Sequence, residues 1–341
     1  MKKRSILIFM IIIALAMFGC SSIKFSEKAD ILRVYSELPE EITSGLIQGF
    51  EKNSKGKFKI ELVKGPLKKD QNLANSLKAL ECDIWLGGTA EDYFLADNKK
   101  MLQPYQAKDL SNIPTGLRDK HGAWTGLFTT NLVFVANRNS LISLGYDKPG
   151  SWEDLLQENF QHELVISDPA LKQGGYRLLT TLWQLFGEKK FDEYMLHFKK
   201  QETEYAESDE AAIEDVRKGR KALTVVPLDL AMASAVKNNI LVVSVPEEGT
   251  SRKVIGAAII AGTKQEATSR AFIDYLVSDS AKAVLDSSEY YVWSLTDNAR
   301  DYTWGKQYSD IFLIHDDLRW CVLNSEEIID KLKPVKKLNG W

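Results

Sequence analysis

The chain has 341 residues, a formal net charge of −3 and a composition, 44% hydrophobic and 27% charged, that is typical of a globular protein. It lacks the strong basic charge of nucleic-acid-binding proteins, so we expect no nucleic-acid partner. The length exceeds what one compact core usually holds and favours two lobes.

The N-terminus has the pattern of a bacterial export signal. A basic start at residues 2–4 precedes an unbroken apolar run over residues 6–18. Charge followed by an apolar stretch is the order of a secretory signal peptide. The run is shorter than the ~20 residues that span a bilayer, so it does not predict a transmembrane helix. We therefore expect the rest of the chain to be exported.

Cys20 stands directly behind this run. A cysteine at this point resembles the signal of bacterial lipoproteins, in which lipid is attached to the thiol and cleavage leaves the cysteine as the new N-terminus. The resemblance implies a signal peptide over residues 1–19, lipidation of Cys20 and a polar tether over residues 20–30. Met17 and Phe18 depart from the usual motif, so an ordinary signal peptide or a short uncleaved anchor is the alternative.

The segment after the tether alternates strands and helices. Residues 31–35 and 82–86 predict short apolar strands, and residues 57–63 predict an alternating strand. Between them, apolar residues at helical spacing predict one helix that ends near residue 53 and another over residues 71–80. This order predicts an α/β domain with a mostly parallel sheet.

The middle of the chain repeats this pattern. We expect strands over residues 132–136, 164–166, 222–226 and 254–261, and helices over residues 152–156, 176–186, 191–200, 211–218 and 266–277. No internal repeat or long linker interrupts the sequence. Two α/β lobes without a flexible join predict a chain that passes between them more than once.

Besides Cys20, the chain has two cysteines, Cys82 and Cys321. In an exported protein they could form one disulfide or remain as two buried free thiols, and the sequence alone leaves both open. The histidines lack the short spacing that is typical of a zinc site: His121, His162, His197 and His315. We therefore expect no metal site and no cofactor.

Several segments, spread over nearly the whole chain, resemble one known family. They are VYS at 34–36, DIWLGG at 83–88, WTGL at 124–127, VFVAN at 133–137, SWEDL at 151–155 and SDPA at 167–170. In this order and spacing they resemble the extracellular solute-binding proteins of ABC importers, in the branch that includes ferric-iron, phosphonate and sugar-phosphate binders.

The resemblance implies an α/β fold built as a two-lobe clamshell, the type 2 periplasmic-binding fold, with mostly parallel sheets and crossover strands. Lobe one would comprise residues 31–130 and 255–341, and lobe two would comprise residues 131–254. The C-terminal segment would pack on lobe one through its tryptophans, Trp293, Trp304 and Trp320.

The same resemblance implies a monomeric binding protein and not an enzyme. It would capture a small anionic solute between its lobes, close on it by a hinge motion and deliver it to an ABC permease. The lipid on Cys20 would hold the protein to the bacterial cell membrane, where it would face the periplasm or the exterior.

Ligands of open α/β sheets bind beyond the carboxyl ends of the strands. That rule selects the candidate ligand-binding residues Ser36, Glu37, Gly87, Gly88, Thr89, Ser167, Gly174, Gly175, Tyr176 and Asp229. Several of them precede helices, whose free backbone N–H groups favour an anion. We expect these helix starts to hold an anionic group, and Asp229 with Glu37 to hold the polar remainder. A plain turn or a helix cap is the alternative role of each residue.

The sequence disfavours iron held by tyrosinates. Iron-binding members of the family present an adjacent tyrosine pair in lobe two, whereas residues 224–230 read TVVPLDL. Tyr290 and Tyr291 do form a pair, but in the expected lobe one. An organic phosphate, a phosphonate or a ferric chelate is therefore the expected ligand class.

Two other function classes stay open. A secreted hydrolase could assemble its catalytic group from distant residues, although no G-x-S-x-G, H-E-x-x-H or Walker motif occurs. The same clamshell could also act as a ligand sensor that presents its closed state to a signalling receptor.

Overall fold

The computed structural model describes residues 30–69, 72–110, 113–288, 291–295 and 311–332. The predicted signal peptide over residues 1–19, the lipidation site Cys20 and the tether up to residue 29 lie outside the described residues, as does Trp304. Within the described part of the chain, no helix is both long enough and apolar enough to cross a membrane.

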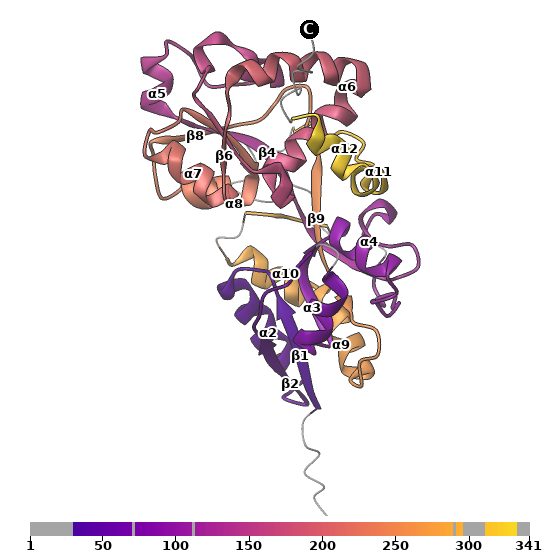
Figure 1. Cartoon of the computed structure of the whole chain (residues 1–341). Coiled ribbons are helices and arrows are strands. Elements are labelled where there is room, and N and C mark those ends of the chain that lie inside the picture. The colour runs from indigo at the N-terminus through magenta and orange to yellow at the C-terminus, as the bar shows by residue number, and fades with distance from the viewer. Residues whose placement is uncertain (1–29, 70–71, 111–112, 289–290, 296–310, 333–341) are drawn as a thin grey trace, which may run out of the picture.

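The first third of the chain forms most of lobe one, the lower part of Figure 1. Its elements are β1 (Asp30–Ser36), α2 (Glu40–Asn53), β2 (Phe58–Val63), α3 (Leu73–Leu80), β3 (Ile84–Thr89), α4 (Ala90–Asn98) and the short turn η1 (Thr115–Leu117). Strand β1 pairs in parallel with both β2 and β3. Helix α2 packs on this sheet because its apolar residues, such as Leu46 and Phe50, recur at helical spacing and are buried.

Two long strands, β4 (Thr125–Asn137) and β9 (Arg252–Ile259), pass between the lobes (Figure 1). Every residue of β4 is buried. Its first half pairs antiparallel with β9 and with β10 (Trp293–Ser294), and its second half pairs antiparallel with β7 and β8. One strand therefore belongs to both lobes, which confirms the expected crossover.

Lobe two contains the remaining central elements. They are α5 (Arg138–Ser143), η2 (Trp152–Leu156), η3 (Glu158–Phe160), β5 (Leu164–Ser167), η4 (Pro169–Leu171), α6 (Gly174–Phe198), η5 (Lys199–Gln201), β6 (Glu204–Ala206), α7 (Asp209–Arg217), β7 (Leu223–Pro227), α8 (Leu228–Ala235) and β8 (Leu241–Ser244). Strand β5 pairs in parallel with β6 and β7. The two helices expected over residues 176–200 form the single element α6, which breaks at Gly187, where a φ of +73° suits glycine.

The strand order β2-β1-β3-β9-β4-β7-β5-β6 joins both lobes in one curled sheet with helices on its faces. The apolar core divides within β4, because Phe128 belongs to the lobe-one core and Leu132 to the lobe-two core. The fold class expected from the sequence is confirmed. The lobe boundaries at residues 130 and 255 stay a prediction.

The C-terminal segment packs differently from our expectation. Helices α9 (Glu266–Leu276) and α10 (Asp279–Asp286) cover lobe one, but α11 (Leu318–Leu323) contacts α4, and α12 (Ser325–Asp330) contacts α6 of lobe two. The Trp320 ring lies 5.2 Å from that of Trp183, and Ile328 completes the lobe-two core. The expectation that Trp320 packs on lobe one is therefore wrong, because its apolar partners lie on α6.

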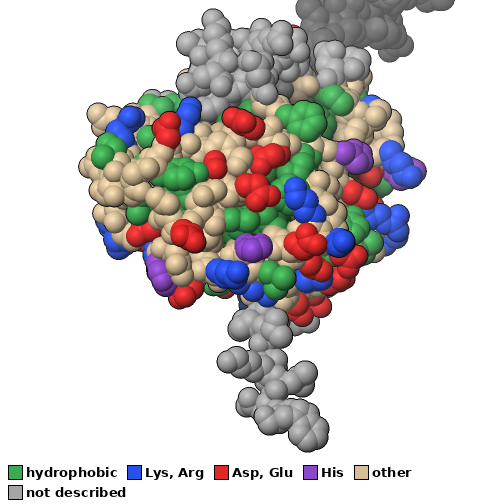
Figure 2. Space-filling model, turned by 90° about the horizontal axis from the view of Figure 1, so that it is seen from above, with side chains coloured by type: hydrophobic (Ala, Val, Ile, Leu, Met, Phe, Trp, Pro, Cys, Tyr) green, Lys and Arg blue, Asp and Glu red, His purple; other side chains and the backbone are tan. Residues whose placement is uncertain are grey.

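Trp293 lies at the junction of the lobes, where its Nε1 donates a hydrogen bond of 2.9 Å to Asn131 Oδ1. Cys82 and Cys321 are both buried free thiols, so they do not form a disulfide. Burial raises the pKa of Cys82 to about 11 and that of Cys321 to about 12. The face drawn in Figure 2 mixes acidic, basic and apolar side chains and carries no extended basic surface.

Candidate functional site

A cleft of about 640 Å³ lies where α4, α6, α7, β9 and the C-terminal helices meet. Acidic and basic side chains line it in equal number: Glu37, Glu91, Asp92, Asp209 and Glu210 against Lys68, Lys69, Lys172, Arg177 and Lys253. The cleft is large enough for a small organic molecule. Its mixed lining favours a solute held by individual polar contacts over one attracted by net charge.

Lys69 connects two acidic residues on the lobe-one side of the cleft. Its Nζ lies 2.6 Å from Glu37 Oε2 and 2.8 Å from Asp92 Oδ2. Glu37 also accepts a hydrogen bond of 2.7 Å from Trp85 Nε1. Burial alone would lower the pKa of Lys69, but the two carboxylates outweigh it and raise that pKa. Lys69 therefore stays charged, and Glu37 faces the cleft already paired.

The two glycines near the end of β3 make contacts within their own lobe. Gly87 has a φ of +87° and packs against Leu38, and the Gly88 amide donates to the Tyr93 hydroxyl at 3.0 Å. Thr89 and Asp92 form a reciprocal capping box at the start of α4, with N···O distances of 3.0 and 3.2 Å. Thr89 and Asp92 line the cleft, whereas Gly87 and Gly88 do not.

The start of α6 is occupied by a carboxylate from α7. Both Asp209 oxygens lie 3.0 Å from the Gly174 amide, and the Gly175 amide donates to Ser167 Oγ at 2.9 Å. A Cβ on Gly175 would lie 1.9 Å from the Ser167 carbonyl oxygen, and one on Gly174 would lie 2.6 Å from Asp209 Oδ1. The glycine pair therefore allows the chain to approach itself closely.

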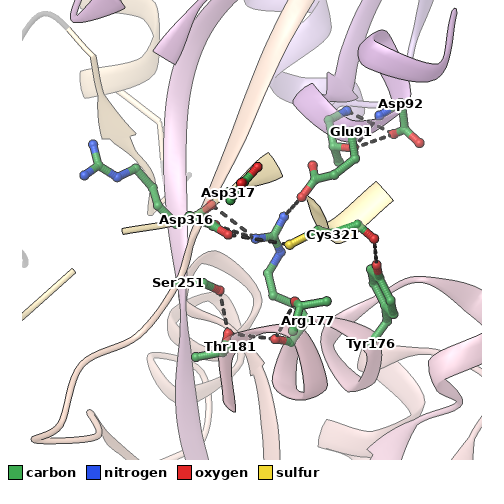
Figure 3. A network of polar contacts seen from close by, with 12 residues as sticks. Glu91, Asp92, Tyr176, Arg177, Thr181, Ser251, Asp316, Asp317 and Cys321 are labelled. Carbon is green, nitrogen blue, oxygen red and sulfur yellow. Dashed lines mark hydrogen bonds and ion pairs between the residues drawn. The ribbon is translucent and has the colours of Figure 1, made fainter. Parts of the chain in front are cut away.

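Arg177 joins three segments of the chain (Figure 3). Its guanidinium contacts Glu91 on α4, lies 3.1 Å from Asp316 Oδ2 in the C-terminal segment, and donates to the Arg252 carbonyl at 3.2 Å. Burial alone would lower the pKa of Arg177, but the neighbouring carboxylates raise it. Beside it, the Tyr176 hydroxyl donates to the Cys321 carbonyl. The arginine thus connects both lobes and the C-terminal segment at one edge of the cleft.

Lys253 lies close to the buried carboxylate of Asp209 and the half-buried carboxylate of Asp229. Asp229 Oδ1 accepts a hydrogen bond of 2.8 Å from Thr130 Oγ1, and β4 places Thr130 opposite Lys253. Burial raises the pKa of both Asp209 and Asp229, and the positive charge of Lys253 partly counteracts it. Within the described part of the chain, the Lys253 ammonium makes no direct hydrogen bond or ion pair. It is therefore available to a ligand.

The structure brings four of the predicted site residues to the cleft: Glu37, Thr89, Gly174 and Tyr176. The others do not line it: Ser36, Gly87, Gly88, Ser167, Gly175 and Asp229. Ser36 instead contacts Thr43 Oγ1 at 2.8 Å and accepts from the Leu38 amide at 3.2 Å. Its alternative role as a local cap explains that position.

The sequence analysis missed the charged residues that shape the cleft, including Lys69, Lys172, Asp209 and Lys253. They come from four separate segments and follow no local motif, so no sequence signal marked them. Across the described ranges, no three His, Cys, Asp or Glu side chains gather in a way that could hold a metal ion.

Comparison with known proteins places the chain among binding proteins. The profile of the family described as bacterial extracellular solute-binding protein matches residues 84–311. An uncharacterized protein of Haemophilus influenzae is 25% identical over 203 residues, which are 58% of this chain and 59% of that protein. The Fe(3+)-binding periplasmic protein of Serratia marcescens is 22% identical over 273 residues, or 77% of this chain and 78% of that protein.

Solved structures share the fold. The periplasmic binding protein AfuA from Actinobacillus pleuropneumoniae, solved with exogenous fructose-6-phosphate bound, superposes with a TM-score of 0.74 at 19% identity. The alignment covers 89% of this chain and 97% of that one. The family match spans most of both lobes and agrees with the crossover architecture and the cleft. The chain therefore belongs to the bacterial extracellular solute-binding protein family.

Proposed function

We propose that this chain is the solute-binding component of an ABC importer. It captures a small solute in the cleft, closes its lobes and delivers the solute to a membrane permease. The observation that carries the proposal is the polar cleft of about 640 Å³ between two lobes that are joined by β4 and β9. Family membership supports the same role.

The crossing strands supply the hinge. Strand β4 pairs with β9 and β7, and β9 pairs with β4 and β3, so the two strands connect the lobes. Small changes in their backbone dihedral angles rotate one lobe against the other. Solute that contacts both lobes stabilises the closed arrangement by the difference in its affinity for the two states. A permease then recognises the closed protein.

The ligand is a small organic anion that also carries hydroxyl or amino groups. Its anionic group meets the ammonium groups of Lys253 and Lys172, since the amides at the starts of α4 and α6 already have protein partners. Glu210, which is exposed, and the paired Glu37 accept hydrogen bonds from the polar remainder. The sequence predicted an anion at the helix starts, whereas this assignment places the anionic group at lysine side chains.

The protein works by binding and not by catalysis. Among the described residues that line the cleft there is no histidine and no cysteine, so a Ser–His or Cys–His pair is not assembled there. Lipid on Cys20 holds the mature protein beside its permease, which raises the local concentration of captured solute.

A thermal-shift screen of residues 21–341 tests the proposal. The panel contains sugar phosphates, phosphonates, hydroxy acids, amino acids and ferric chelates. A solute that binds only the folded state stabilises it by about 2.7 kcal/mol when its concentration is 100 times its dissociation constant. We expect at least one small organic anion to raise the melting temperature. A response to neutral sugars or to bare metal ions alone would contradict the proposed ligand class.

A further inference from the structure

The Asp209 carboxylate occupies a position that a ligand anion could take. It is only 4% exposed, yet it borders the cleft beside Gly174 and Lys253. Both of its oxygens accept from the Gly174 amide at the first residue of α6. The Ser167 hydroxyl, which accepts from the Gly175 amide, also contacts this carboxylate. The start of α6 therefore directs its donors at an internal anion.

Helix geometry explains why an anion is stable there. The first amides of a helix have no partner within the helix, and the dipole places partial positive charge at that end. A carboxylate or a phosphate accepts hydrogen bonds from these amides and is attracted by the partial positive charge. For that reason helix starts bind anions. In this chain the requirement is met before any solute enters, by a side chain that belongs to another helix.

Asp209 is not the N-cap of its own helix. Ser208 is the N-cap of α7, and its side chain accepts from the Ala211 amide at 3.1 Å. The Asp209 amide donates to Gln173 Oε1 at 3.0 Å, which orients the carboxylate towards α6. Asp209 also lies in the first turn of α7, where its charge favours the positive end of that helix, but its oxygens accept from the start of α6.

We propose that Asp209 is a specificity-determining residue, a built-in anion that excludes phosphate from the α6 end of the cleft. The exclusion is both steric and electrostatic, because a phosphate at this point would meet a carboxylate instead of free amides. The solute therefore makes no anionic contact with the Gly174 and Gly175 amides, and its anionic group contacts lysine side chains instead. This inference refines the proposed function and rests on it for the identity of the cleft as the solute site.

Asp209→Ala is the direct test. The substitution exposes the Gly174 amide and the Ser167 hydroxyl to the cleft, with Lys253 close by. Inorganic phosphate is the probe, and titration calorimetry on residues 21–341 is the measurement. We expect the variant to bind phosphate saturably, whereas we expect no saturable binding to the wild-type protein.

Two controls separate the proposed role from a general charge effect. Asp209→Asn keeps an oxygen that accepts from Gly174 and keeps the site filled, so we expect no gain in phosphate binding. Glu210→Ala removes the same charge from a neighbouring, exposed position that also borders the cleft. An equal gain in Glu210→Ala would overturn the inference, and so would a folded Asp209→Ala variant that does not bind phosphate.

A measurement on the wild-type protein covers the case in which Asp209→Ala does not fold. Titration with phosphate should leave the amide NMR resonance of Gly174 unchanged, whereas a saturable shift of that resonance would refute the exclusion. Neither experiment requires the natural solute. If the phosphate experiments contradict the role of Asp209, the solute-binding proposal still stands. If the thermal-shift screen finds no solute, the phosphate result can still be interpreted.

Discussion

The ionisation of Asp209 follows from its immediate surroundings. Burial raises the pKa of this carboxyl, while the hydrogen bond from Ser167, the charge of Lys253 on β9 and the Gly174 amide lower it, and Glu210 on the same helix raises it. The net result is a pKa above the ordinary value of 3.8. Protonation therefore favours the folded state relative to the unfolded chain.

This predicts the sign of a pH effect. A folded-state pKa above the unfolded value means that the stability linked to this group is present at low pH and is lost as pH rises through the folded-state pKa. Asp209→Asn removes that titration. The unfolding free energy of wild type minus that of Asp209→Asn should therefore fall as pH increases from 3.8 upwards. Urea unfolding of both proteins over a pH series measures this difference in unfolding free energy. A difference that rises with pH would refute the raised pKa of Asp209.

Single residues were predictable from the sequence where their partners are local. The cap formed by Thr89 with Asp92, for example, spans three positions. The contacts that define the cleft were not predictable. Asp209 is 35 positions from Gly174, and Arg177 is 139 positions from Asp316, so nothing in the local pattern connects them.

At the scale of elements, α6 begins in a space too narrow for side chains. Its first two residues are glycines because β5 and α7 approach the helix backbone directly. From the sequence we expected this glycine pair to contact the ligand. Their packing role depends on how three elements meet, which the spacing of residues does not determine.

Gly175→Ala should therefore destabilise the protein. The added Cβ would lie 1.9 Å from the Ser167 carbonyl oxygen, and backbone must move to accommodate it. Overpacking of this kind costs about 1–3 kcal/mol of unfolding free energy. Gly116→Ala is the matched control, since nothing lies within 4 Å of a Cβ there. It should change stability by less than about 0.5 kcal/mol in urea unfolding, and equal effects in the two variants would contradict this account.

The order of strands and helices was largely predictable, because apolar periodicity reflects which faces are buried. Several features were not, among them β8 and the length of β4. Strand β8 (Leu241–Ser244) carries no distinct alternation, and β4 is longer than the expected strand over residues 132–136. The additional residues of β4 pair with β9, so its length is set by the contact between lobes.

At the scale of the whole molecule, the C-terminal segment and Arg177 tie the lobes together. Helix α11 contacts α4 of lobe one and α12 contacts α6 of lobe two. Arg177 adds an ion pair between α6 and Glu91 of α4, and one Glu91 oxygen is buried without a hydrogen-bond partner. We propose that these contacts limit how far the cleft opens when solute is absent.

Glu91→Gln should widen the unliganded protein. The substitution weakens the ion pair between lobes but leaves the contact of Arg177 with Asp316. We expect a larger radius of gyration in small-angle X-ray scattering. Glu81→Gln is the control, because Glu81 pairs with Arg33 within lobe one and is exposed. An unchanged radius in Glu91→Gln, or an equal increase in both variants, would show that the ion pair does not restrain the lobes.

The central claim is that the cleft beside Lys253 is the solute site. Titration calorimetry with the solute found by the thermal-shift screen tests it in wild type, in Lys253→Ala and in Lys264→Ala, which removes an exposed lysine that does not line the cleft. The account predicts that Lys253→Ala weakens binding at least about tenfold, or ~1.4 kcal/mol, while Lys264→Ala binds like wild type. Equal affinity of wild type and Lys253→Ala would contradict it.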